Sequence, residues 1–245
     1  MIHKLIPLIA SASFVWAGPL AAEIIFSDSF SYDLPDMAPL TGDSAEGRPG
    51  IPWKSAVDEP AARIVLTGTG KKKALLLNDS RQKPREEIYT FLDRMKLQPG
   101  ATIFYGATLL PSKANDNPES GRVLSFSTSD KRGEGVTRAR LSMWTKDGAI
   151  ALGVDSDSVM VEGSRTFPPG QPIRVVVGYS FGGASRLWAG QPGKLSEETD
   201  LIAESPGRRI DPFSCFWIGI PSNSQLEIDD LVISTEWAEA AGEAE

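Results

Sequence analysis

Two carboxylates near the end of the chain, Glu227 and Asp229, have a spacing that could serve catalysis or metal binding. They lie in the apolar-rich segment Leu226–Trp237, which is typical of a β-strand, and alternate residues of a strand share one face. The adjacent pair Asp229 and Asp230 runs against strand propensity and needs a reason. Three interpretations follow: a catalytic carboxylate cluster, a calcium ligand, or a structural closing strand.

Other catalytic chemistry is restricted by the residue types that the chain lacks. Its single histidine, His3, lies in an N-terminal segment that we expect to be removed, which excludes a Ser-His-Asp triad from the mature protein. The single cysteine, Cys215, lies in the apolar run Phe213–Ile218, where a buried and unreactive thiol is expected. The residue types therefore favour a protein without catalytic activity, but they do not exclude an enzyme.

Arginine and tryptophan alternate with apolar residues in the segment Arg138–Trp144. Because alternate strand residues share a face, Arg138, Arg140 and Trp144 should lie together, opposite an apolar face. An indole beside guanidinium groups can stack on a sugar ring and can bind hydroxyl, uronate or sulfate groups. This segment predicts a glycan-binding face.

A second segment repeats the pattern, with Arg186 and Trp188 on either side of Leu187. Trp53, on the Pro- and Gly-rich loop 48–54, is a further candidate at the rim of such a site. The alternative is that Trp144 and Trp188 belong to the core or are covered by loops, since aromatic side chains are usually buried.

Residues 1–22 have the layout of a secretory signal peptide. Lys4 precedes an apolar run from Leu5 to Leu20, and the small pair Ala21-Ala22 marks the expected cleavage site. We therefore expect a secreted or periplasmic protein, with an uncleaved membrane anchor as the alternative. No later segment approaches the roughly 18 apolar residues that a membrane span needs, so no span is expected after cleavage.

The overall charge argues against a nucleic-acid partner. The chain carries 32 acidic and 25 basic residues, for a formal net charge of −7. Loss of Lys4 with the signal segment would make this about −8, and no basic stripe stands out, so nucleic acid is not an expected partner. The remaining length suits one domain over 23–237 followed by a flexible tail, 238–245.

Alternation of apolar and polar residues, bounded by turn residues, recurs at short intervals along the mature chain. The only helical patterns are weak ones over 194–203 and 237–245, so the pattern predicts an all-β sandwich. The predicted strands are 24–30, 62–66, 74–78, 87–95, 102–110, 122–128, 138–145, 149–154, 173–181, 185–189, 216–220 and 226–234.

Three motifs occur in a characteristic order: Phe26–Phe30, then the hairpin Val177–Trp188 with its Tyr-x-Phe and Leu-Trp pairs, then Ile228–Trp237. Together they resemble the opening strand, the hairpin and the closing strand of the concanavalin A-like lectin/glucanase superfamily, in its LamG-like form. The resemblance covers roughly Phe26 to Trp237. It implies a two-sheet antiparallel jelly-roll sandwich whose first and last strands lie side by side.

The resemblance also bears on catalysis. Glucanases of this superfamily carry Glu-x-Asp-x-Glu on an interior strand, and retaining hydrolysis needs two carboxyl groups about 5–5.5 Å apart. Here Glu227 and Asp229 match the first two positions, but Leu231 or Val232 stands where the second Glu should be. We therefore expect a noncatalytic module that binds polysaccharide or a cell-surface glycan. A diverged hydrolase or lyase is the alternative, and a structural or adhesion domain that binds protein is the second.

Calcium is a possible structural cofactor. It takes oxygen ligands from carboxylates and backbone carbonyls and does not need histidine. If the terminal strands pair as the resemblance implies, Asp28 and Asp229 are the candidate ligands. The alternative is that Asp28 caps a turn and Asp229 accepts backbone amide hydrogen bonds.

Overall fold

The computed structural model describes residues 23–30, 52–55, 62–66, 73–79, 85–95, 101–130, 136–156, 159–180, 182–207, 212–220 and 223–242. The predicted signal segment and most of the loop around Trp53 lie outside these ranges. In this part of the chain, no helix is long and apolar enough to cross a membrane.

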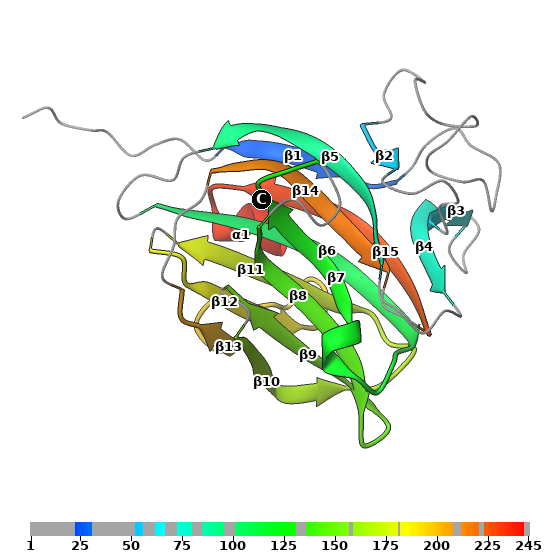
Figure 1. Cartoon of the computed structure of the whole chain (residues 1–245). Helices are drawn as coiled ribbons and strands as arrows, with labels where there is room; N and C mark the ends of the chain where they lie inside the picture. The colour runs from blue at the N-terminus through cyan, green and yellow to red at the C-terminus, as the bar shows by residue number, and fades with distance from the viewer. Residues whose placement is uncertain are drawn as a thin grey trace, which may run out of the picture.

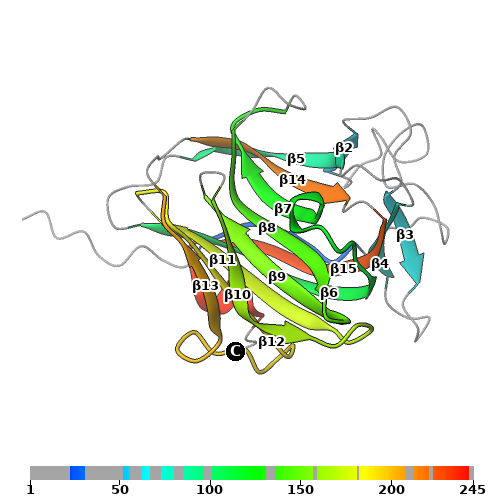
Figure 2. The same ribbon diagram turned by 60° about the horizontal axis from the view of Figure 1, so that its bottom comes forward.

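Two antiparallel sheets make up the fold, and they lie in two layers (Figures 1 and 2). Sheet A has the order β13-β12-β11-β6-β15-β4-β3, with β1 also paired to β15. Its strands are β1 (Ile24–Asp28), β3 (Ala62–Leu66), β4 (Lys73–Asp79), β6 (Thr102–Lys113), β11 (Ile173–Ser180), β12 (Ser185–Gly190), β13 (Leu201–Ser205) and β15 (Ser224–Ser234).

Sheet B has the order β10-β9-β8-β7-β14-β5-β2. Figure 2 shows β7, β8 and β9 in front of β6 and β15. The strands of this sheet are β2 (Lys54–Ser55), β5 (Arg85–Met95), β7 (Arg122–Ser127), β8 (Thr137–Lys146), β9 (Ala149–Asp155), β10 (Met160–Phe167) and β14 (Phe213–Ile220). The 3-10 turn η1 (Pro118–Ser120) precedes β7, and α1 (Trp237–Ala241) follows β15.

Strand alternation determines which side chains fill the space between the sheets. On β9, Ile150, Leu152 and Val154 belong to the main core cluster, which leaves Gly153 and Asp155 on the outer face of sheet B. Tyr105 lies at the centre of the core, and its hydroxyl donates a hydrogen bond of 2.6 Å to the Ala139 carbonyl. The predicted all-β, two-sheet sandwich is confirmed, and β1 and β15 pair as expected.

All twelve predicted strands correspond to observed strands, but three observed strands were not predicted. β10 was missed because its exposure pattern is irregular and largely solvent-facing, so it lacks an apolar alternation. β2 is only two residues long. β13 overlaps the segment 194–203, where the helical expectation was wrong: Leu201–Ser205 pairs with β12.

The first residues of the predicted tail form a short helix, in line with the weak helical pattern over 237–245. Trp237–Ala241 forms α1, which packs on β6, β11 and β15. Ala240 and Ala241 are buried, and Gly242 ends the helix in the left-handed conformation with φ of 74°. Small residues allow this short helix to approach sheet A, because a Cβ added at Gly106 would lie 1.8 Å from the Ala240 carbonyl oxygen.

A β-bulge explains the adjacent aspartates of the closing strand. Asp230 has a left-handed backbone, with φ of 49°, and the register of β15 against β6 shifts between Asp229 and Val232. Aspartate tolerates this conformation better than β-branched residues do. The left-handed bulge at Asp230 therefore gives a structural reason for an aspartate at this position of the strand.

Candidate functional site

Arg140 and Asp155 form an ion pair on the outer face of sheet B. Both Nε and Nη2 of Arg140 lie 2.5 Å from Oδ2 of Asp155, and the two residues are register partners on β8 and β9. The side chain of Asp155 is only 2% exposed, whereas that of Arg140 is 16% exposed. The guanidinium group therefore reaches solvent while it holds a buried carboxylate.

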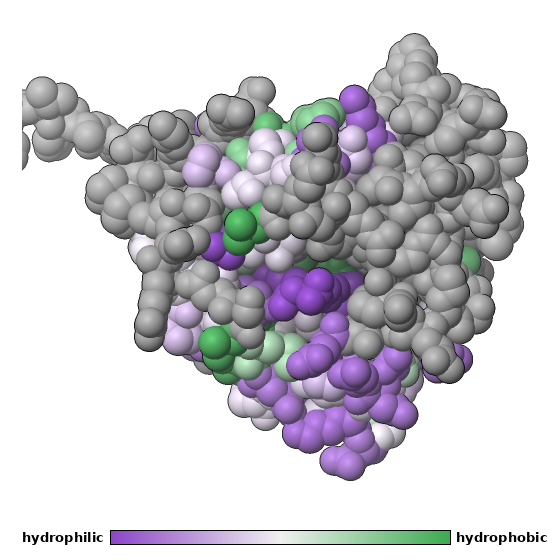
Figure 3. Space-filling model, in the orientation of Figure 1, coloured by the Kyte–Doolittle hydropathy of each residue, from purple (hydrophilic) through white to green (hydrophobic). Residues whose placement is uncertain are grey.

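Two further arginines act on the same carboxylate. Burial raises the pKa of Asp155, and the positive charges of Arg140, Arg122 and Arg138 oppose this rise. We call these four residues the arginine cluster. It comprises three guanidinium groups and one carboxylate, contributed by β7, β8 and β9. Figure 3 shows strongly hydrophilic residues gathered over β7 and β8 in the middle of this face.

Trp144 shares the strand with Arg140 but does not offer a ring face. It is 3% exposed, and its ring lies against Gly153 of β9, where an added Cβ would come within 3.0 Å of the indole. The predicted grouping of Arg138, Arg140 and Trp144 on one strand is therefore observed only in part. Arg140 pairs with Asp155, Arg138 is buried and donates a hydrogen bond to the Thr137 carbonyl, and Trp144 is packed and does not offer its ring to a sugar as expected.

An aromatic cluster lies on the same sheet, formed by Lys54, Tyr89, Phe91 and Trp217. The rings of Tyr89 and Trp217 stack with centroids 4.9 Å apart, and Phe91 meets Tyr89 edge-on at 5.5 Å. Lys54 Nζ lies 4.6 Å from the centroid of Phe91. Phe91 is 49% exposed, so it gives this cluster an open apolar surface.

Strand register connects the two clusters across the sheet. Lys54 pairs with Tyr89, Tyr89 with Trp217, and Trp217 with Ser125 of β7. Trp217 is fixed by a hydrogen bond of 3.0 Å from its Nε1 to the Ser129 carbonyl. β8 then follows β7, and β9 follows β8. The strand neighbours Ile88, Ile218 and Leu141 belong to the core, so the aromatic cluster and the arginine cluster both lie on the outer face of the sheet.

The sequence pattern did not indicate the aromatic cluster. Period-two alternation on β5 does place Tyr89 and Phe91 on one face. Their contact with Trp217, however, depends on the pairing of β5 with β14, two segments more than a hundred residues apart. No local pattern encodes that register.

Arg186 and Trp188 lie on the other sheet, away from the arginine cluster. Arg186 forms an exposed ion pair with Glu204 at 3.2 Å. Trp188 is 4% exposed, donates a hydrogen bond to the Glu197 carbonyl, and packs against Trp237. The expectation that Trp188 stacks on a ligand is therefore corrected: it belongs to a small apolar cluster beneath α1.

Trp53 is a core residue and not a rim residue. It is 1% exposed and lies between Phe26 and Phe30, with ring centroids 5.7 and 6.0 Å away. Its Nε1 donates a hydrogen bond of 2.6 Å to Oδ2 of Asp28. Trp53 therefore cannot bind a ligand in the way the sequence suggested.

The candidate calcium ligands already accept hydrogen bonds. Asp28 accepts them from Trp53 and from the backbone N–H of Phe30, and Asp229 accepts one of 2.8 Å from the N–H of Asp230. Among the described residues, no group of three or more acidic, histidine or cysteine side chains could hold a metal ion. These contacts match the alternative roles of turn capping and backbone binding.

The carboxylates Glu227 and Asp229 lie on β15, in sheet A, and not among the arginines. Burial raises the pKa of Glu227, and the neighbouring charge of Asp229 adds to the rise. Leu226 and Ile228, the strand neighbours of Glu227, belong to the core, so both carboxylates face outward from sheet A. The two acids and the arginine cluster therefore cannot form one site.

Comparison with solved structures identifies the fold. A conserved carbohydrate esterase from the Shiga toxin-encoding bacteriophage phi24B is 10% identical, with 88% of this chain and 99% of that chain covered at a TM-score of 0.52. The globular domain of T. cruzi calreticulin is 11% identical, with 89% and 90% covered at a TM-score of 0.51. No family model matches the sequence, and neither does any curated protein.

An endo-β-1,4-glucuronan lyase from the fungus Trichoderma reesei is also similar, at 14% identity, with 75% of this chain and 90% of that chain covered and a TM-score of 0.49. Together with the two-sheet topology, the esterase and calreticulin structures show a concanavalin A-like jelly-roll sandwich, as the motifs predicted. At these sequence identities, structural similarity shows the fold alone, and the ligand has to be inferred from the site itself.

Proposed function

We propose that the protein is a noncatalytic module that binds an anionic polysaccharide on the outer face of sheet B. The observation that carries this proposal is the arginine cluster, in which Arg140 pairs with the buried Asp155 and the charges of Arg122 and Arg138 act on the same carboxylate. Three guanidinium groups on neighbouring strands are notable in a chain whose formal net charge is −7. Arginine is well suited to carboxylate and sulfate groups because its planar fork can donate two hydrogen bonds to them.

The aromatic cluster favours a carbohydrate ligand over a small inorganic anion. The half-exposed ring of Phe91 can contact the apolar face of a sugar, and Lys54 beside it adds a positive charge. From β2 to β9 the face crosses six neighbouring strands, or about 24 Å at a strand spacing of about 4.8 Å. A polymer that lies across the strands would reach both clusters, whereas a single sugar would not.

The carboxylates of this face support binding over hydrolysis. Asp155 is buried and held by Arg140, and Glu162 on the neighbouring strand β10 pairs with Lys146. A retaining or inverting hydrolase needs one carboxylate as nucleophile or base and another as acid. These two acids, among the described residues of the face, are engaged in ion pairs, which favours a binding role. Secretion, which the N-terminal segment predicts, would bring such a module to extracellular or periplasmic polysaccharide.

The proposal is tested with a charge-matched pair of double variants. Arg122→Gln/Arg138→Gln removes two positive charges of the cluster but keeps the pair between Arg140 and Asp155. Arg165→Gln/Arg186→Gln removes the same charge from two exposed arginines that pair with Asp200 and Glu204. Calorimetric titration with polygalacturonate, chondroitin sulfate and neutral dextran compares the variants, and thermal unfolding confirms that each is folded.

We expect the first variant to bind the polyanions about 10- to 100-fold more weakly, because a hydrogen bond to a charged group contributes about 1.5–3 kcal/mol. The second variant should bind like the parent protein. Equal losses in both variants would show non-specific attraction and contradict the site. Incubation of the same polysaccharides with the protein, followed by size analysis, separates binding from the alternative of a hydrolase or lyase, which would shorten the chains.

A further inference from the structure

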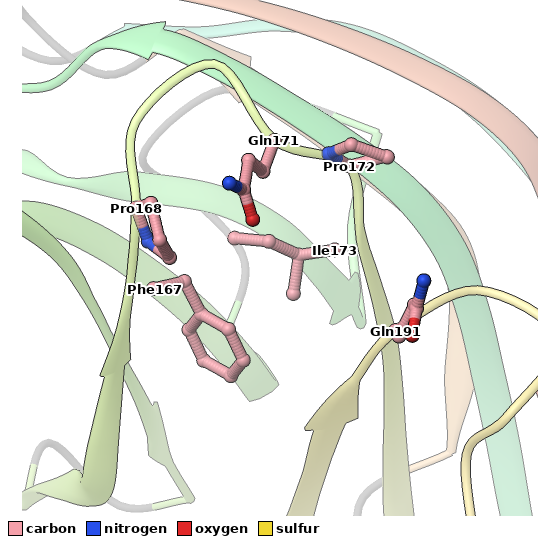
Figure 4. A pocket seen from close by; sticks show the side chains of 6 residues that line it. All are labelled: Phe167, Pro168, Gln171, Pro172, Ile173 and Gln191. Carbon is pink, nitrogen blue, oxygen red and sulfur yellow. The ribbon is translucent and has the colours of Figure 1, made fainter.

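A pocket of about 300 Å³ lies where β10 turns into β11, next to the end of β12. Figure 4 shows the side chains of Phe167, Gln171 and Ile173 pointing toward one another, with Gln191 on the neighbouring strand end. Elements of both sheets therefore contribute to it. The lining residues are Phe167, Pro168, Gln171, Pro172, Ile173 and Gln191.

The framework of the pocket is fixed by the chain around it. The N–H of Gly170, in the turn, donates a hydrogen bond of 2.7 Å to the Pro111 carbonyl on β6. Pro168 and Pro172 restrict the backbone on either side of this contact. The N–H of Lys194 donates to the Gln191 carbonyl at 3.1 Å and closes the opposite turn. A preformed pocket loses little conformational entropy when a ligand binds.

The lining combines an apolar floor with an uncharged polar rim. Ile173 belongs to the core and is 1% exposed, and the half-buried Phe167 packs against the same core. Gln171 and Gln191 are exposed and offer amide groups that both donate and accept hydrogen bonds. None of the six lining residues carries a charge. This chemistry suits a neutral ligand with one apolar face and several hydroxyl groups.

We propose that this pocket is a second binding site, which takes a single neutral sugar ring or a neutral chain end. Ligand pockets span about 300–1,000 Å³, and a volume at the lower limit suits one ring and not an oligosaccharide. Phe167 contacts the apolar face of the ring, and the two amides bond its hydroxyls. The absence of a charged lining residue sets this site apart from the arginine cluster.

The two sites are separate. Asp155 pairs with Met160 at one end of the β9–β10 ladder, and Ile150 pairs with Phe167 at the other. Five residues of extended strand span about 17 Å. One sugar ring cannot reach both, so the pocket binds independently of the polyanion proposed for the arginine cluster.

Ligand-observed NMR on the full chain tests the site, with methyl β-D-glucopyranoside and methyl β-D-galactopyranoside as neutral probes and glucuronic acid as the anionic control. The variant Gln171→Leu/Gln191→Leu keeps the size of both side chains but removes their amides. Gln225→Leu, at an exposed glutamine on β15, is the matched control. Phe167→Leu tests the aromatic floor with a residue that can still fill the core.

We expect saturation transfer to at least one neutral glycoside, with affinity about 10- to 30-fold lower in the double glutamine variant and unchanged in Gln225→Leu. Phe167→Leu should also weaken binding. Three results would overturn the proposal: no transfer to either neutral probe, equal affinity in parent and double glutamine variant, or equal binding of glucuronic acid. Loss of glycoside binding in Arg122→Gln/Arg138→Gln would also overturn it, because it would place the sugar on the arginine cluster.

Discussion

The outer faces of the two sheets carry the same residue types but use them differently. On sheet A, Arg174 donates hydrogen bonds to the carbonyls of Ala240, Ala241 and Asp230, and α1 covers the surface. On sheet B, Arg140 pairs with Asp155, on which the charges of Arg122 and Arg138 also act, and Phe91 stays half exposed. The donors of Arg174 end on backbone carbonyls beneath a helix, and this arginine stabilises the fold. The guanidinium of Arg140 is partly exposed on an open face, where it can also contact an external anion.

Tryptophans show the same contrast. On sheet A, Trp188 packs edge to face against Trp237, the first residue of α1, with ring centroids 6.3 Å apart. On sheet B, Trp217 is also buried, but it supports Tyr89, and Tyr89 in turn contacts the exposed Phe91. The indole of Trp217 therefore supports an open aromatic surface, whereas Trp188 and Trp237 close the contact between sheet A and α1.

Substitution of Arg174 by Met should have the largest effect on stability. Burial lowers the pKa of Arg174 to about 10, so the guanidinium stays charged at neutral pH and holds three backbone carbonyls. Its loss leaves these carbonyls without their donor, at a cost of about 3 kcal/mol or more in the free energy of unfolding. For a domain of this size, that corresponds to a fall of roughly 6–12 °C in Tm.

Urea and thermal unfolding measure this change, and Arg186→Met is the control. Arg186 is in an exposed ion pair, so its loss should cost at most about 1 kcal/mol. Polyanion binding should be unchanged in Arg174→Met at a temperature where it is folded. A fall in binding as large as that in the Arg122→Gln/Arg138→Gln variant would remove the distinction between the two faces.

Asp155→Asn should raise the affinity and change stability little. The variant loses the pairing with Arg140 but also removes a buried charge whose pKa is raised by burial, so we expect the free energy of unfolding to change by less than about 1 kcal/mol. One negative charge leaves the face, and chondroitin sulfate should bind up to about 10-fold more tightly. Denaturation and calorimetry on the same samples check both expectations. Weaker binding would show that Asp155 supports the site by shape and not by limiting its charge.

Phe91→Ala tests the aromatic end of the face. Removal of a half-exposed ring should change the free energy of unfolding by less than about 1 kcal/mol. Affinity for the polysaccharide should fall about 5- to 10-fold because sugar contacts and the interaction with Lys54 are both lost. Leu201→Ala, at an exposed apolar residue of β13 on sheet A, is the matched control. Equal effects of the two substitutions would exclude a specific role for Phe91.

A pH dependence of binding should follow from Asp155. Its pKa is raised by burial, so the carboxyl gains a proton at a higher pH than an exposed aspartate, and one negative charge beside the three arginines is then lost. Because sulfate groups stay ionised, affinity for chondroitin sulfate should rise as pH falls through this raised pKa. For stability, a raised carboxyl pKa means that Asp155 opposes folding above that pKa and does so less as pH falls. Titrations of parent and Asp155→Asn should differ only in this step of the binding curve.

The sequence allowed the layers of the fold to be predicted but only part of the site. Alternation placed Arg140 opposite Leu141 and Met143, and this is how β8 is arranged. Alternation cannot say what covers an outer face, which is why Trp188 was expected to bind a ligand although α1 encloses it. The pairing of Tyr89 with Trp217 depends on long-range register, and register is set by the packing of whole strands.

Addition of calcium should have the smallest effect on stability among these tests. The candidate ligands lie where β1 pairs with β15. Both carboxylate oxygens of Asp28 accept hydrogen bonds, from Trp53 Nε1 and from the N–H of Phe30, each at 2.6 Å. An ion would have to compete with these donors, so millimolar calcium added to chelator-treated protein should leave Tm unchanged within about 1 °C. Asp28→Asn and Asp229→Asn then separate the two roles. A rise of several degrees in the parent that both variants abolish would establish a shared calcium site, because hydrogen bonding alone gives no dependence on the ion.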